Sequence, residues 1–208
     1  MTGRKALLLV GSPRGIGHSS SDRLGSVVLD TLKGRGLDTE KLHVHAVMDS
    51  PAACESALAA IGFSDAVILS VPLYVDSFPA PVVALLERIA ERKTGAGRVR
   101  LFLLLQCGFP EAAHNATALA IAARFAAEVG WEWLGGTALG GTGGFIKDVN
   151  AVLARVGKAI ADGEPVPEVT LSVPFPAWLY RLVGNVMWRR EARKRGATRS
   201  LRARPYEE

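Results

Sequence analysis

Residues 5–21, KALLLVGSPRGIGHSSS, decide the fold. The apolar run at 5–10 is closed by Gly11, a pattern typical of a strand buried inside a parallel sheet. A helix is expected at 21–33, where apolar residues recur near helical spacing and two glycines then end the pattern. A buried strand that leads through a Gly- and Ser-rich loop into a helix is the opening unit of an α/β fold.

The rest of the chain repeats this alternation of strand and helix. Further strands are expected at 41–47, 65–71, 99–105 and 131–138, and further helices at 52–62, 80–93, 111–129 and about 146–162. Five strands alternating with five helices predict a doubly wound α/β fold with five parallel strands in the order 2-1-3-4-5. We expect this domain to span residues 1–164, followed at 165–208 by a Pro-rich linker and a basic, amphipathic helical extension.

The composition limits the classes of function. The 208 residues are 49% hydrophobic and 22% charged, as in ordinary globular proteins. No apolar run approaches the roughly 20 residues of a membrane span, and the N-terminus has no signal-peptide cleavage site. Cys54 and Cys107 are far apart, which favours reduced thiols in a cytoplasmic protein. Two cysteines are too few for a cysteine-ligated iron–sulfur cluster, and the histidines share no metal-ligand spacing.

The net charge of +5 is concentrated in the tail. Residues 177–208 hold nine Arg or Lys and three acids, a net charge of +6. Because the motifs of nucleic-acid-binding proteins are missing, we expect no nucleic-acid partner. Six apolar residues of the tail share one face of the expected helix, and we expect this face to pack on the same or a neighbouring subunit. Attachment to a membrane surface is the alternative. The six residues are Trp178, Leu179, Leu182, Val183, Val186 and Met187.

Three loops carry the candidate chemistry, and they follow the first, third and fourth expected strands. These strands are neighbours in the expected order, so their loops converge on one crevice at the carboxyl ends of the strands. The first loop combines glycines, serines, Arg14 and a helix N-terminus with Ser21 as the expected N-cap, an arrangement that binds phosphate. Its glycine spacing fits neither a Walker A motif nor G-x-G-x-x-G. It matches that of short-chain dehydrogenases, but their Tyr-x-x-x-Lys pair is missing.

The other two loops offer aromatic and sulfur groups. Residues 72–79, PLYVDSFP, present Tyr74 and Phe78 beside backbone amides, which suits a flat flavin ring; the alternative is that these aromatics only pack. Residues 106–111, QCGFPE, include Cys107. A nucleophilic Cys107 with His114 as its base is one interpretation, but no nucleophile elbow surrounds it, and a small buried side chain is favoured.

The segments GSPRGIGHSSS (11–21), DAVILSVPLYVDSFPAP (65–81) and QCGFPEAAHN (106–115) resemble the flavodoxin-like superfamily of NAD(P)H-dependent FMN reductases and NAD(P)H:quinone reductases. Residues 135–144 and 176–196 look like its branch near the iron–sulfur flavoproteins, although the cluster cysteines are missing. The resemblance implies a flavodoxin-like fold with FMN and NAD(P)H as cofactors. It implies these cofactor-binding residues, with Tyr74 also a candidate for orienting the substrate: Ser12, Arg14, Ser19, Ser20, Ser21, Pro72, Leu73, Tyr74, Val75, Asp76, Gln106, Cys107, Gly108 and Phe109.

The function implied by this resemblance is an FMN-dependent oxidoreductase. It would pass hydride from NAD(P)H through the flavin to a quinone, a free flavin or another small acceptor. The cofactor carries such chemistry, which explains why no acid–base pair stands out. A flavodoxin-type electron carrier and a flavin-free partner-binding module on the same fold are the alternatives. A homodimer or homotetramer is expected, because flavin sites of this superfamily often lie near a subunit interface.

Overall fold

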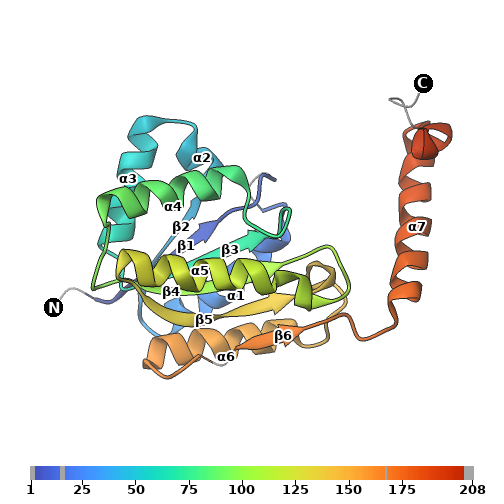
Figure 1. The fold of residues 1–208 in the computed structure, drawn as a ribbon. Coiled ribbons are helices and arrows are strands. Elements are labelled where there is room, and N and C mark those ends of the chain that lie inside the picture. The colour runs from blue at the N-terminus through green and yellow to red at the C-terminus, as the bar shows by residue number, and fades with distance from the viewer. Residues whose placement is uncertain (1–2, 15–16, 167, 204–208) are drawn as a thin grey trace. The chain divides into compact units, whose positions relative to one another are not determined.

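The computed structural model describes residues 3–14, 17–166 and 168–203. In this part of the chain six parallel strands form one sheet, in the order β2-β1-β3-β4-β5-β6 (Figure 1). The strands are β1 (Lys5–Val10), β2 (Asp38–His43), β3 (Ala66–Pro72), β4 (Arg100–Gln106), β5 (Glu132–Leu139) and β6 (Val169–Leu171). The doubly wound α/β class is therefore confirmed.

The prediction of five strands is wrong, because β6 adds a sixth. This strand pairs with Thr137–Leu139 of β5 and lies in the segment that the sequence analysis interprets as a linker. It is only three residues long and its side chains are at most partly buried, so it leaves no apolar pattern. The second strand also begins and ends earlier than expected, and its end is followed by the short helix α2 (Val44–Met48).

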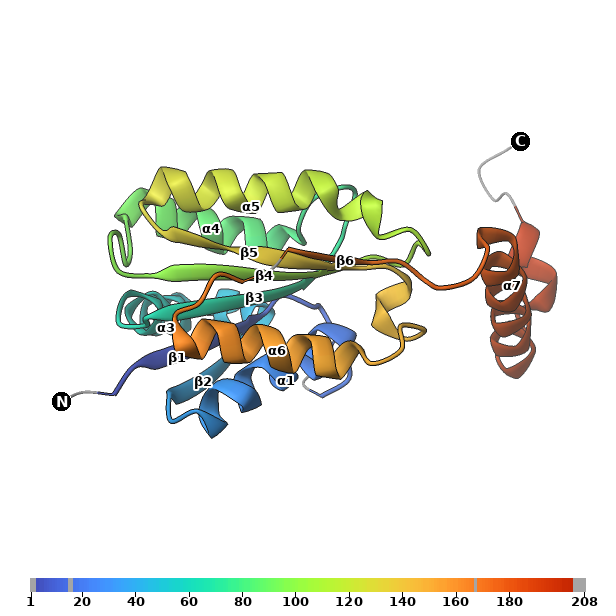
Figure 2. The same ribbon diagram turned by 90° about the horizontal axis from the view of Figure 1, so that it is seen from below.

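Helices cover both faces of the sheet (Figure 2). On one face lie α3 (Pro51–Gly62), α4 (Ala80–Arg92) and α5 (Ala116–Val129); on the other lie α1 (Ser20–Gly34) and α6 (Val149–Asp162). Alternate residues of each central strand serve the two faces: Leu7 and Leu9 pack with the first group of helices, and Leu8 with the second. This double burial explains why β1, β3 and β4 read as unbroken apolar runs.

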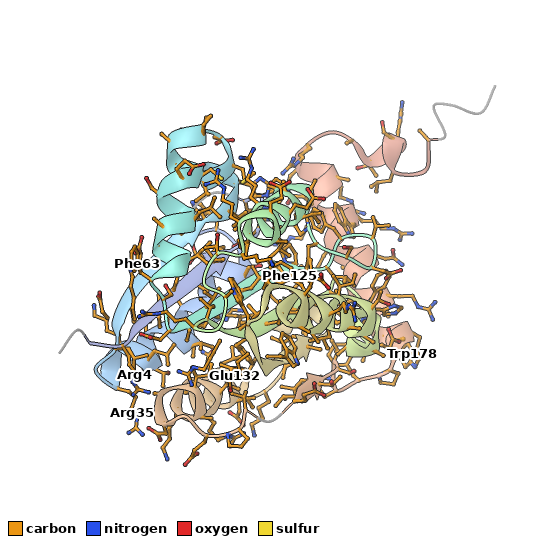
Figure 3. The ribbon with its side chains drawn as sticks, turned by 60° about the vertical axis from the view of Figure 1, so that its left-hand side comes forward. Arg4, Arg35, Phe63, Phe125, Glu132 and Trp178 are labelled. Carbon is orange, nitrogen blue, oxygen red and sulfur yellow. The ribbon has the colours of Figure 1, made fainter. Side chains whose placement is uncertain are left out.

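The hydrophobic core beneath α3, α4 and α5 includes a packed pair of aromatic side chains. Phe125 of α5, labelled in Figure 3, meets Trp131 edge-on with ring centres 5.6 Å apart. The indole N–H of Trp131 donates a hydrogen bond to the carbonyl oxygen of Thr94 at 2.8 Å. Edge-to-face geometry with the indole nitrogen satisfied is the favourable way to bury such a pair.

The chain divides into two compact units, residues 1–173 and 174–208. The second unit contains α7 (Ala177–Lys194) and the single-turn helix η3 (Thr198–Arg202). Trp178, labelled in Figure 3, begins α7 and is 62% exposed. None of the helices in the described residues is long and apolar enough to cross a membrane.

Candidate functional site

A cleft of about 290 Å³ lies at the carboxyl ends of β1, β3 and β4. Every residue that lines it, except Thr142, is among those that the sequence predicted. They are Ser12, Arg14, Ser19, Ser20, Ser21, Pro72, Leu73, Tyr74, Gln106, Gly108 and Thr142. The convergence of three loops on one crevice is thus observed, as the topological rule for open α/β sheets requires.

Four predicted residues do not line this cleft. Val75 and Asp76 form the tip of a tight hairpin, with Val75 99% exposed. The side chain of Cys107 is buried, and the ring of Phe109 lies against that of His114 with centres 4.3 Å apart. Phe78, the other aromatic residue of the second loop, is buried in the core beneath α4, so for this residue the packing alternative is correct.

The first loop turns sharply from β1 into α1. Gly11 begins it, and a Cβ at that position would lie 2.4 Å from Cγ1 of Val71, so only glycine fits. The hydroxyl of Ser19 accepts a hydrogen bond from the N–H of Asp22 at 3.0 Å, which makes Ser19 the N-cap. The expectation that Ser21 is the cap is wrong, because the N-cap lies two residues earlier than the apolar pattern indicates.

The N-terminus of α1 opens on the cleft. By helix geometry the amides of Ser20 and Ser21 have no acceptor within the helix, and the helix dipole makes this end partly positive. Arg14 also lines this cleft. Backbone amides at a helix N-terminus and a guanidinium group are donors of the kind that bind a phosphate monoester.

Asp22 is an acid in the first turn of α1, directly after this loop, and it is not among the residues predicted from the sequence. Its carboxylate accepts hydrogen bonds from the backbone N–H of Gly17 at 2.7 Å and from Nζ of Lys41 at 2.8 Å. Burial raises the pKa of Asp22, but these two hydrogen bonds, together with the charges of Lys41 and His43, outweigh burial and hold the pKa below its ordinary value. Asp22 therefore stays ionised and fixes the loop, while Lys41 neutralises its charge.

A buried ring of hydrogen bonds ties α1 to the two central strands. The hydroxyl of Ser21 donates to Oε1 of Gln106 at 3.4 Å, and Nε2 of Gln106 donates to Oγ of Ser70 at 3.3 Å. The hydroxyl of Ser70 in turn donates to the carbonyl oxygen of Ser21 at 2.8 Å. Ser70 was not predicted, since it lies within the apolar run of β3. The ring orients two cleft-lining side chains, those of Ser21 and Gln106.

The second loop is a rigid hairpin. Tyr74 and Ser77 exchange backbone hydrogen bonds at 2.9 and 3.0 Å. Val75 and Asp76 between them have φ values of 48° and 56°, as in a type I′ turn. The N–H of Leu73 donates to the carbonyl oxygen of Gln106 at 2.7 Å, which holds the loop against the third. Tyr74, 47% exposed, is thereby fixed at the mouth of the cleft.

The glycine cluster after β5 adds Thr142 to the cleft. The N–H of Thr142 donates to the carbonyl oxygen of Cys107 at 2.8 Å, and the N–H of Gly141 donates to the carbonyl oxygen of Phe109 at 2.6 Å. At Gly140 a Cβ would lie 2.3 Å from the carbonyl oxygen of Pro110. The run of glycines at 140–144 was the signal for this close approach of two loops.

Cys107 has the surroundings of a structural thiol. Its sulfur is buried against Nδ2 of Asn115 at 3.5 Å and the carbonyl oxygen of Phe109 at 3.5 Å. Burial raises the pKa of the thiol above its ordinary value. The nearest candidate base, His114, instead lies beside the ring of Phe109 and 3.9 Å from the carboxylate of Glu111. A protonated, enclosed thiol is a poor nucleophile.

Solved structures share the fold of this chain at low sequence identity. An NADH:FMN oxidoreductase in its apo form is 20% identical, with a TM-score of 0.63 over 84% of this chain and 98% of that one. An azoreductase from Bacillus anthracis is 14% identical, with a TM-score of 0.56 over 77% and 99%. Rubredoxin oxygen:oxidoreductase from Desulfovibrio gigas is 13% identical, with a TM-score of 0.60 over 78% of this chain. The present chain spans only 37% of the length of that last protein.

The sequence itself matches a family model. A search among curated proteins found no significant match. Residues 4–127, more than half of the chain, match the model described as NADPH-dependent FMN reductase. This match confirms the resemblance drawn from the three loops, and it includes β1, β3, β4 and the loops that follow them. The chain therefore belongs to the family of NADPH-dependent FMN reductases, enzymes that use FMN and NAD(P)H.

Proposed function

We propose that the cleft at the ends of β1, β3 and β4 is the FMN site of this oxidoreductase. The observation that carries the proposal is the make-up of the cleft lining. The loop after β1 and the start of α1 contribute Arg14 and four serines, and the loop after β3 contributes Pro72, Leu73 and Tyr74. FMN combines a phosphate with a flat ring, so the polar and the apolar loop fit its two parts.

The side chains of the chain bind and orient, and the cofactor does the chemistry. Bound FMN would supply the chemistry of hydride transfer between NAD(P)H and an acceptor. Arg14 and the first amides of α1 neutralise the phosphate, and the salt-bridged Asp22 keeps the loop in place without facing it. Tyr74 offers a half-exposed aromatic face at the mouth, which suits a flat substrate.

We infer that the acceptor is a small, flat molecule such as a quinone or a free flavin. Pro72, Leu73 and Tyr74 contribute apolar and aromatic surface to the cleft lining, which favours an aromatic partner over a sugar or a peptide. Solved structures of similar fold include an azoreductase and a flavone reductase, whose named substrates are also flat and conjugated. The alternative of a one-electron carrier predicts slow or no reduction by NADPH.

The test is to mix the purified protein with FMN, remove free flavin and add NADPH without oxygen. Retained visible absorption that NADPH bleaches supports the proposal, and reoxidation by quinone, flavin or azo dye then identifies the acceptor class. Arg14→Gln should weaken FMN binding by about tenfold or more, because it removes a charge-assisted contact to phosphate. Arg155→Gln, an exposed change on α6, is the matched control. Equal affinities in the two variants would contradict the assignment of Arg14.

We further infer a homodimer or homotetramer in the cytoplasm. Three apolar or aromatic residues at or beside the mouth of the cleft are exposed, namely Tyr74, Val75 and Phe109, and a second copy is suited to cover them. Both cysteines are unpaired thiols, which supports a reducing compartment. Sedimentation of Phe109→Ser tests the assembly: a shift toward monomer supports this interface, and an unchanged profile contradicts it.

A further inference from the structure

The second unit, residues 174–208, has a cleft of its own that the FMN chemistry does not use. It has a volume of about 340 Å³ and lies between the end of α7 and η3. Its lining is Arg189, Arg193, Thr198, Arg199 and Leu201. Three guanidinium groups and a hydroxyl around one hollow form the donor set that phosphate prefers.

These arginines have no anionic partner among the described residues. The acid of α7, Glu191, is already engaged by Lys194 at 3.5 Å and Arg195 at 3.0 Å. Arg189, Arg193 and Arg199 form no ion pair in the part of the chain that the structure describes. The cleft therefore presents uncompensated positive charge to whatever occupies it.

An apolar stripe leads along α7 into this cleft. Trp178, Leu182 and Val186 are spaced four residues apart, and Arg189 and Arg193 continue the same face of the helix. The helix is therefore divided along its length, apolar at its first half and cationic at its second. From Trp178 to Arg193 the stripe runs about 22 Å.

The apolar half of the stripe is exposed. Trp178 is 62%, Leu182 53% and Val186 58% accessible, and Met187 and Trp188 beside them are 61% and 70% accessible. So large an exposed apolar surface, with two tryptophans, marks an interaction site. Its continuity with a phosphate-binding cleft means that the occupant is apolar at one end and anionic at the other.

We propose that the unit formed by α7 and η3 docks on a membrane surface rich in acidic phospholipids. The three-arginine cleft holds a lipid phosphate, while Trp178, Leu182 and Val186 enter the boundary between headgroups and acyl chains. Tryptophan and arginine are the side chains that favour this boundary. A nucleic acid offers phosphate but no apolar layer for Leu182 and Val186. A second copy of the chain offers little net attraction, since its residues 1–176 carry a net charge near zero, 16 basic against 17 acidic residues.

The experiment measures binding of the full chain to vesicles by co-sedimentation. Vesicles of phosphatidylcholine alone are compared with vesicles that also contain phosphatidylglycerol, at low and at high salt. We expect binding only to the acidic vesicles, weakened by salt. The variant R189Q/R193Q/R199Q should bind roughly 100-fold more weakly, about fivefold for each basic residue removed from an anionic surface.

A matched variant keeps the test specific. R88Q/R124Q/R155Q removes the same charge from exposed positions on α4, α5 and α6, far in sequence from the tail, and should change binding by less than about threefold. Equal losses in the two triple variants would overturn the proposal, because net charge alone would then explain binding. Failure of the unmodified chain to bind acidic vesicles at low salt would overturn it as well.

Tryptophan quenching tests the apolar half independently. Brominated lipids should quench the fluorescence of Trp178 and Trp188 but not that of Trp131 and Trp133, which pack in the core of the first unit. In W178F/W188F the quenching should disappear while the protein remains folded by circular dichroism. Quenching that persists in this variant overturns the proposed orientation. If instead the triple tail variant alters the sedimentation coefficient and no vesicle binds, the face belongs to a second copy and the proposal is wrong.

Discussion

The carboxylate of Asp22 accepts a hydrogen bond from the backbone N–H of Gly17 at 2.7 Å, and Ser19, the N-cap of α1, lies between these two residues in the chain. Gly17 has a φ of 78°, a backbone conformation that residues other than glycine rarely adopt. The contact fixes the turn before α1, while Lys41 neutralises the acid from β2 at 2.8 Å. A negative charge thus organises a loop whose free donors suit an anion.

Asp22→Asn should loosen this loop. The change removes the charge that receives the Gly17 and Lys41 hydrogen bonds and leaves Lys41 without its partner. Since hydrogen bonds to charged groups contribute about 1.5–3 kcal/mol, we expect a stability loss of about 2 kcal/mol and FMN binding weakened by roughly tenfold. Urea unfolding and flavin-fluorescence titration measure the two effects. Asp30→Asn, an exposed acid on the same helix, is the control; an equal effect there would contradict the role of Asp22.

The contribution of Asp22 should also depend on pH. Because its folded-state pKa lies below the ordinary value of 3.8, the ionised form stabilises the fold. That contribution is complete above the unfolded-state value and is lost as the pH falls through the folded-state pKa. The stability gap between the unmodified chain and Asp22→Asn should therefore stay constant from neutral pH down to about pH 5 and shrink only in stronger acid. A gap that closes near neutral pH would assign the effect to another group.

How much of this fold was predictable depends on burial. The strands β1, β3 and β4 are buried on both faces, so their apolar runs identified them and placed the loops that follow. The edge strands were harder. None of the residues of β2 is fully buried, and β6 is three residues long, so neither leaves a clean pattern.

The candidate site divides in the same way. Loop residues such as Arg14 and Tyr74 were predictable because parallel strands gather their following loops at one edge. Ser70 was not predictable, since its role depends on hydrogen bonds to residues of α1 and β4, and no local sequence pattern reveals such contacts. Asp22 had a usable signal: a serine at 19 followed three residues later by an acid is a helix-capping pattern.

Ser70→Ala should break the buried ring of hydrogen bonds. It leaves Nε2 of Gln106 without its partner in a buried position, and it removes the bond that the carbonyl oxygen of Ser21 accepts in addition to its helical one. An unsatisfied buried group costs about 1–3 kcal/mol, so we expect a stability loss in this range, with weaker FMN binding because Gln106 lines the cleft. Thermal unfolding measures the first effect and flavin titration the second. Ser56→Ala, an exposed serine that bonds only within its own helix, should change stability by less than about 0.5 kcal/mol.

Val75→Asn should stabilise the protein. Val75 is β-branched yet has a φ of 48°, and its side chain is 99% exposed, so the turn gains no packing in return for the strain. Asparagine is favoured in type I′ turns, and we expect a gain of about 1 kcal/mol in unfolding free energy. Val75→Ile keeps the branched side chain and should give no gain. A destabilised asparagine variant would indicate that the valine is covered in the assembled protein, as the proposed oligomer interface requires.

Cys107 should prove structural despite its position at the centre of the third loop. Its thiol is buried, its pKa is raised by burial, and Asn115 holds its sulfur at 3.5 Å. Iodoacetamide should therefore modify neither Cys107 nor the equally buried Cys54 in the folded protein. It should modify both after unfolding in urea, as mass spectrometry will detect.

Cys107→Ala should lose about 1 kcal/mol of stability through the small cavity it leaves and keep kcat within about threefold. Cys54→Ala is the control, because Cys54 is equally buried but lies in α3, outside the three loops that form the cleft. Rapid alkylation of Cys107 in the folded protein, with loss of NADPH oxidation, would mean that the thiol faces the reacting groups. The assignment of Cys107 as a structural residue would then be wrong.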